Sequence, residues 1–147
     1  LRRTIGDGHF MSVLSRFSRE KAGKLVTTED FETEVEVVTG REMDWFFDQW
    51  IRDTGYPIYR VYHTGSEAAG SAAAGKVFTV RGQLLQEQDG RVFRAIVPLV
   101  FELENGERIT REIWNTNRRQ TFEYALPDKV KRIMIAPDHS VYFKPAR

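Results

Sequence analysis

The chain has 147 residues, enough for one domain of ordinary size or two small ones, and 29% of them are charged. Its net charge of +1 argues against a general nucleic-acid-binding protein, and its lack of cysteine excludes disulfides and thiolate zinc sites. No apolar run reaches the ~18–20 residues of a membrane-spanning helix, so we expect no membrane segment in this chain.

Helical spacing dominates the first 57 residues. Leu1 and Ile5 precede Gly6 and predict the tail of a helix. A second helix is predicted over about residues 8–22, with Asp7 as its N-cap. Its apolar positions follow i, i+3, i+4 and i+7, which is one face of a helix. They are Phe10, Val13, Leu14 and Phe17.

Two further helices are predicted before Pro57. The first starts at Thr27 or Thr28, where Thr27 and Asp30 approximate a capping box, and it ends at Gly40. Its buried stripe is Phe31, Val35 and Val38. The second runs from a cap at Asp44 to about Asp53. Its apolar residues cover more than half of its circumference, so we expect packing on two sides. These residues are Trp45, Phe46, Phe47, Trp50 and Ile51.

The residues after Pro57 have the alternation of β-strands. About seven short strands separated by turn signals predict an all-β immunoglobulin-like sandwich. The low-complexity stretch Gly65–Gly75 is predicted to be a flexible loop. The fold class is therefore α+β by segments, with helices first. The predicted strands are Ile58–Tyr62, Val77–Gln86, Val92–Glu104, Glu107–Trp114, Arg119–Leu126, Val130–Ala136 and Val141–Lys144.

Turn residues predict how these strands connect. Asp89-Gly90 is a hairpin signal, and Asn105-Gly106 is the strongest such signal in the chain. Residues 137–140 form another predicted turn. Pro98 cannot donate to a ladder, so it predicts a sheet edge or a bulge.

The sequence contains neither the residue pattern of zinc-dependent catalysis nor that of nucleophilic catalysis. The zinc motif H-E-x-x-H is absent, and His9, His63 and His139 are interpreted as surface or turn histidines. Ser12, Ser15 and Ser18 lie on a predicted helix without a G-x-S-x-G turn. His139 and Ser140 are neighbours on the chain, and on a strand they would point to opposite faces.

Three other clusters are interpreted as structural. Glu32 and Glu36 share a helix face, which we interpret as a solvated face within the acidic stretch Glu29–Glu36. The aromatic cluster Trp45–Trp50 is interpreted as core. We interpret a basic set in the β part as a solvated sheet face. Its residues are Arg118, Arg119, Lys129, Lys131 and Arg132. We therefore assign no catalytic, cofactor-binding or metal-binding residue to this chain.

An ordered series of motifs resembles one known family. The series is LRRTIGD with Phe10, TTEDF at Thr27–Phe31, Gly40, WFFDQWI at Trp45–Ile51 and TGYP at Thr54–Pro57. It resembles the aminopeptidase N-type (gluzincin) zinc metallopeptidases. The resemblance implies that residues 1–57 form the helical end of a thermolysin-like catalytic domain and residues 58–147 the β-sandwich domain that follows. Ile133–Lys144 resembles the last hairpin of that sandwich.

The resemblance also implies a function for a longer parent protein. Members of the family remove N-terminal residues from peptides with one zinc ion, whose ligands lie upstream of these motifs. This chain is then expected to be a structural C-terminal portion, inactive alone and without a cofactor, with the rest of the catalytic domain as its partner. Because its helices would lose that partner, we expect self-association through residues 1–57.

Two other interpretations stay open. The parent is either an active enzyme or a non-catalytic relative that uses the same architecture as a protein-interaction scaffold. Alternatively, the chain is an independent β-sandwich binding module with helices in front of it. The pattern does not indicate a compartment.

Overall fold

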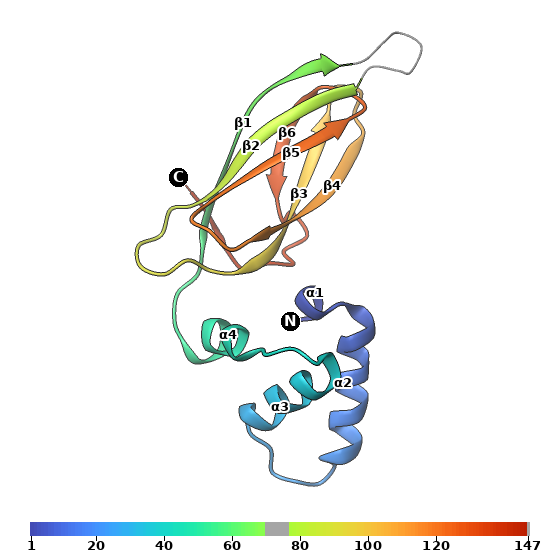
Figure 1. Ribbon diagram of the computed structural model, residues 1–147, viewed down its shortest axis with the longest axis vertical. Helices are drawn as coiled ribbons and strands as arrows, with labels where there is room; N and C mark the ends of the chain where they lie inside the picture. Colours follow the sequence, from blue (N-terminus) through green and yellow to red (C-terminus); the bar gives the residue numbers. More distant parts are fainter. Residues whose placement is uncertain (70–76, 147) are drawn as a thin grey trace. The chain divides into compact units, whose positions relative to one another are not determined.

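Residues 1–69 and 77–146 are described by the computed structural model, and they divide into a helical unit, Leu1–Gly55, and a β unit that begins at Tyr56 (Figure 1). The described residues confirm the predicted fold class, with four α-helices followed by seven strands in two sheets. The helices are α1 (Arg2–Ile5), α2 (Asp7–Glu20), α3 (Thr28–Thr39) and α4 (Asp44–Phe47), and a π-helical turn, η1 (Asp48–Arg52), follows α4.

Helix α3 begins with the predicted capping box. The Asp30 backbone N–H donates to the Thr27 hydroxyl over 3.2 Å, and the Thr27 N–H donates to the Asp30 carboxylate over 2.9 Å. Gly40 ends the helix in the left-handed conformation, with φ of 65°. Both ends of this helix therefore lie where the sequence predicts them.

Two predicted N-caps are wrong. Asp7 is the first residue of α2 and Gly6 precedes it as the cap, while the Asp7 carboxylate accepts from the Arg2 guanidinium over 2.7 and 2.8 Å instead of from a helix N–H. Asp44 is likewise the first residue of α4, and Met43 precedes it as the cap. The predicted helix through Asp53 is also not one α-helix, since the Asp53 N–H bonds to the Asp48 carbonyl five residues back, over 3.0 Å.

The aromatic segment contributes the core of the helical unit, as predicted. Phe46 and Phe47 are 8% and 2% exposed, and Trp45 and Trp50 pack against this core while partly buried. The Phe31 ring meets the Phe47 ring edge-on at 6.3 Å between centroids. Two expected core residues are instead exposed, Leu14 by 39% and Ile51 by 55%. Leu14 lies at the margin of its stripe, and Ile51 lies in the wider π-helical turn.

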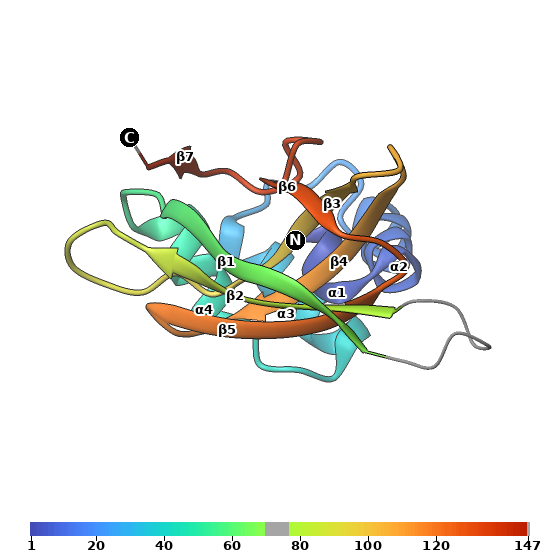
Figure 2. The same cartoon turned by 90° about the horizontal axis from the view of Figure 1, so that it is seen from above.

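The β unit consists of two stacked sheets (Figure 2). One has the strand order β5-β2-β1-β7 and the other β4-β3-β6. Phe101 of β3 packs on Phe122 and Tyr124 of β5, with ring centroids 6.0 and 5.6 Å apart, so the core lies between the sheets. The strands are β1 (Ile58–Ala69), β2 (Val77–Gln86), β3 (Ala95–Leu103), β4 (Arg108–Asn115), β5 (Arg119–Leu126), β6 (Val130–Ile135) and β7 (Lys144–Pro145).

Strand β1 is longer than predicted. It continues past Tyr62 to Ala69, so residues 65–69 of the predicted loop are strand. Antiparallel pairing with β2, ending at Ala69 opposite Val77, keeps these small and polar residues extended despite their weak strand preference. The remainder of the predicted loop, residues 70–75, lies outside the described residues.

One of the two predicted hairpins forms. Asn105-Gly106 connects the paired strands β3 and β4, and the Gly106 N–H donates to the Leu103 carbonyl over 3.1 Å. Gly106 has a φ of 88°, which a glycine adopts without strain. The Asp89-Gly90 hairpin is wrong, because β2 and β3 belong to different sheets.

Pro98 lies on the central strand of its sheet, so the predicted edge position is wrong. The pairing of β3 with β6 stops at Leu99 opposite Ile135, and the Pro98 carbonyl accepts from Ala136 N over 2.8 Å just beyond it. The N and C=O groups of one strand residue point to the same side. The missing N–H of Pro98 therefore lies where β6 ends.

The end of the chain differs from the predicted strand Val141–Lys144 and from the predicted hairpin Ile133–Lys144. A turn follows β6 as predicted, with the His139 N–H donating to the Ala136 carbonyl over 3.0 Å. Residues 141–144 do not form the expected strand. Instead β7, Lys144–Pro145, pairs in parallel with Ile58 and Tyr59 of the other sheet, so Ile133–Lys144 is not a hairpin.

Candidate functional site

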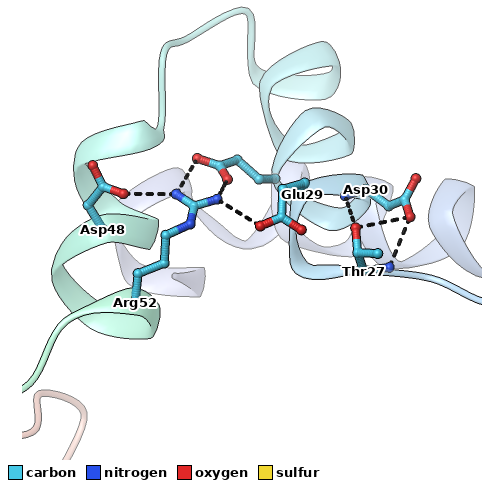
Figure 3. A network of polar contacts seen from close by, with 6 residues as sticks. Thr27, Glu29, Asp30, Asp48 and Arg52 are labelled. Atoms are coloured by element: carbon cyan, nitrogen blue, oxygen red, sulfur yellow. Dashed lines mark hydrogen bonds and ion pairs between the residues drawn. The ribbon is translucent and has the colours of Figure 1, made fainter.

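The densest charged network of the helical unit centres on Arg52 (Figure 3). Its guanidinium donates to Asp48 over 2.9 Å and to both carboxylate oxygens of Glu32, and Glu29 lies 3.6 Å away. These hydrogen bonds, first to Glu32 and then to Asp48, raise the pKa of Arg52. The Glu32 side chain is only 8% exposed, so its interpretation as part of a solvated helix face is wrong. The network joins η1 to α3.

An acidic cluster lies beside this network. Carboxylate oxygens of Glu32, Glu36 and Asp44 come within 4.8 Å of one another. Two of the three are already engaged, since Glu32 pairs with Arg52 and Glu36 accepts from Met43 N over 2.8 Å. Zinc in proteins is held mainly by nitrogen and sulfur ligands, and this cluster offers neither. The donor set does not fit a zinc ion, and the hydrogen bonds explain its arrangement structurally.

The three histidines occupy separate elements. His9 is in α2, with Nδ1 3.0 Å from the Ile5 carbonyl oxygen, His63 is in β1, and His139 is in the turn after β6. Among residues 1–69 and 77–146, no histidine joins a group of three possible metal ligands.

The hydroxyls of Ser18 and Ser140 bond to groups of their own segments and not to a histidine. Ser18 Oγ donates to the Leu14 carbonyl over 2.6 Å, a common bond for a serine inside a helix. Ser140 Oγ donates to Asp138 over 2.7 Å rather than to the neighbouring His139. These contacts hold local turns and do not activate a nucleophile.

The predicted basic face divides into two parts. Lys131 and Arg132 are exposed and pair with Glu102 over 3.6 and 2.8 Å, as expected for a solvated face. The Arg132 hydrogen bond lowers the pKa of Glu102. Arg118 behaves differently, because its guanidinium donates to the carbonyls of Gln88 and Gly90 over 2.6 Å each. Arg118 holds the connection between the sheets.

A buried polar cluster inside the β unit was not predicted from the sequence. Gln86, 2% exposed, donates to the Phe93 carbonyl over 2.7 Å and accepts from the Phe93 N–H over 2.8 Å. Its amide also donates to Asn115, which accepts from the Tyr59 hydroxyl over 3.3 Å. Burial raises the pKa of Tyr59. Gln86 continues the inward alternation of β2, and that periodicity was the available signal.

A hollow of about 630 Å³ lies on the sheet formed by β1, β2 and β5. The lining residues Tyr62, Thr64, Arg81, Gln83, Thr121 and Glu123 alternate with the buried residues Val80, Leu84 and Phe122, so their side chains project from the outer face of the sheet. His63, Gly82 and Phe122, the row between them, also line the hollow. Arg81 and Glu123 form a two-bond ion pair across its rim, over 3.0 and 3.1 Å. The other side chains of this face are Tyr62, Thr64, Gln83 and Thr121.

Comparison with known proteins gives no family assignment. No protein-family model matches the chain, and no curated protein matches it significantly. Within residues 1–69 and 77–146, no helix combines the length and apolar character needed to cross a bilayer.

Proposed function

We propose that this chain is a structural, non-catalytic portion of a zinc aminopeptidase. In this proposal the helical unit completes the helical lobe of a thermolysin-like catalytic domain, and the β unit is the sandwich domain that follows it. The parent protein would remove N-terminal residues from peptides with one zinc ion held by residues outside this chain.

The observation that carries the proposal is the order and spacing of the motifs from Leu1 to Pro57. The series spans the helical unit, and the chain then passes into a two-sheet unit beginning at Tyr56. The family has helices and sandwich in that same order. This agreement supports the proposal at the level of architecture.

The polar contacts of the helical unit favour a supporting role. Arg52 satisfies the nearly buried Glu32, and Glu36 satisfies the Met43 N–H at the start of α4. Carboxylates engaged in this way fix the relative positions of neighbouring elements. The described residues thus contribute rigidity to a catalytic lobe rather than a reacting group.

A direct assay tests the non-catalytic part of the proposal. The purified chain should neither bind zinc stoichiometrically in a titration nor hydrolyse leucine amide, while an active zinc aminopeptidase does both under the same conditions. Turnover by the chain that a chelator abolishes would refute the structural assignment.

The coding sequence upstream of Leu1 tests the family assignment. An open reading frame with H-E-x-x-H and a distal glutamate supports the aminopeptidase, and expression of that longer protein should yield chelator-sensitive activity. A degraded motif in the same frame would identify the scaffold relative instead. A reading frame with no segment related to this family would contradict the proposal. The interpretation as an independent β-sandwich binding module would then remain.

A further inference from the structure

The proposed function does not use the hollow on the outer face of β1, β2 and β5. Two rows of paired residues project from this face, Tyr62–Gln83–Thr121 and Thr64–Arg81–Glu123, and the row His63–Gly82–Phe122 lies between them. Its volume of about 630 Å³ lies within the ~300–1,000 Å³ of small-molecule sites.

The hollow can recognise a ligand only through side chains. The strands beneath it are paired with one another through the antiparallel registers of β1 with β2 and β2 with β5. The main chain of the central strand β2 is therefore used within the sheet on both sides, whereas β5 and the part of β1 beyond Tyr59 pair on one side only, at the edges of the sheet. A peptide that binds by adding a strand needs a sheet edge, and the face of the sheet does not offer one.

The charges of the hollow favour a neutral ligand. Among the described residues that line it, Arg81 and Glu123 carry the full charges, and they neutralise each other in a two-bond pair. An anion would have to displace Glu123 from Arg81, and a cation would have to displace Arg81 from Glu123. A neutral ligand can accept from the guanidinium edge and donate to the carboxylate while the pair stays intact.

The remaining groups combine one aromatic surface with hydroxyl and amide groups. The Tyr62 side chain belongs to a residue that is 51% exposed, and the Arg60 guanidinium carbon lies 5.9 Å from the centre of its ring. Gln83 provides an amide, and Thr64 and Thr121 provide hydroxyls. A sugar ring matches this combination, because its C–H face packs on an aromatic ring while its hydroxyls donate and accept around the rim.

We infer that this outer sheet face binds a neutral oligosaccharide, with Tyr62 as the stacking platform and Gln83, Thr121 and the Arg81–Glu123 pair as hydrogen-bonding groups. This site is independent of the proposed peptidase parentage. Sugar binding can be lost or found without any change in zinc binding or in the upstream reading frame.

NMR titration of the full chain tests the site with three neutral probes: maltohexaose, cellohexaose and chitohexaose. At least one should give saturable shifts of the backbone amides of Tyr62, Gln83 and Thr121. Tyr62→Ala should weaken that binding about tenfold or more, and Gln83→Leu should also weaken it. Tyr142→Ala, at a tyrosine that is 69% exposed and does not line the hollow, is the matched control and should bind unchanged.

Three results would overturn the inference. The first is an absence of saturable shifts with all three probes. The second is equal affinity of wild type and of folded Tyr62→Ala, with folding checked from the dispersion of the same spectra. The third is tighter binding of an anionic probe, a heparin hexasaccharide, at these residues, because it would contradict the neutral character of the hollow.

Discussion

The side-chain amide of Gln86 exchanges two hydrogen bonds with the main chain of Phe93, over 2.7 and 2.8 Å. In doing so it takes the place of a residue in a β-ladder at the point where the chain leaves β2. Arg118 fixes the intervening loop through the carbonyls of Gln88 and Gly90. The chain is thereby guided into the second sheet, which explains why the Asp89-Gly90 turn does not form a hairpin.

Gln86→Leu should destabilise the β unit by ~2 kcal/mol or more. The leucine leaves the Phe93 N–H and C=O buried without these partners, and each such group costs ~1–3 kcal/mol. Denaturant unfolding followed by NMR signals of the β unit measures the change. Gln120→Leu, at a less buried glutamine of β5, is the control and should cost under ~0.5 kcal/mol.

Gln86→Glu adds a pH test to the same position. The new carboxylate would be buried beside the Phe93 carbonyl, so its folded-state pKa should rise above the ordinary value of about 4.3. A raised pKa gives stability that is present at low pH and lost as the pH rises. The variant should therefore be less stable near pH 7 than near pH 4, relative to wild type, and equal losses at both pH values would contradict this account.

Arg52→Ala should destabilise the helical unit by ~1–3 kcal/mol. The change leaves Glu32, with a side chain 8% exposed, without the guanidinium that satisfies it. Glu32→Gln in the Arg52→Ala background should recover part of the loss, because a neutral amide is less costly to bury. A double-mutant cycle by denaturant unfolding measures this coupling, and Arg19→Ala on an exposed position of α2 controls for loss of a cation. Additive single effects would argue against the coupling.

Gly82→Ala should destabilise the β unit by ~1–3 kcal/mol. A Cβ at this position would collide with the Phe122 ring and with the Tyr62 carbonyl oxygen, and the second is backbone that cannot rotate away. Adding Phe122→Ala should therefore fail to restore stability. Gly65→Ala is the matched control in a strand, since its Cβ would meet nothing within 4 Å. Thermal unfolding of the three variants decides between a local collision and a general intolerance of alanine.

Acid should loosen the start of α3. The Lys21 side chain, over 2.6 Å, and then the Thr27 N–H hold the pKa of Asp30 below its ordinary value of about 3.9. A lowered pKa gives stability that is present above the ordinary value and lost as the pH falls through the depressed one. Asp30→Asn should remove this acid dependence, whereas Glu42→Gln should keep it. Hydrogen exchange of the α3 amides between about pH 5 and about pH 2 provides the measurement.

The chain should self-associate through its helical unit. Met11 and Val37 are 58% and 60% exposed, and burying large apolar side chains of this kind favours association. Sedimentation velocity should show a concentration-dependent shift that Met11→Lys with Val37→Lys reduces. Tyr142→Lys in the β unit is the control. A monomer at every concentration would count against the prediction.

Local signals predicted the elements that depend on neighbouring residues. The Thr27–Asp30 capping box, the strands Val77–Gln86 and Arg119–Leu126, and the Asn105-Gly106 turn all lie where the sequence placed them. Each is determined within a few residues by capping, alternation or turn conformation.

Long-range contacts account for what the sequence did not reveal. Glu32 lies in an acidic stretch of helix, but its burial depends on Arg52, twenty residues later. Strand β1 extends through a low-complexity segment because β2 pairs with it. The sugar-binding hollow needs β1, β2 and β5 to align Tyr62, Gln83 and Thr121, which no local pattern predicts.

The π-helical turn Asp48–Arg52 makes the length of this segment critical. This turn already takes up one residue more than an α-helical turn, so a further inserted residue would rotate the side chains after it by about 100° around the helix axis. Arg52 would then face away from Glu32. Insertions should accordingly be tolerated at the Asn105-Gly106 turn and rejected between Asp44 and Arg52.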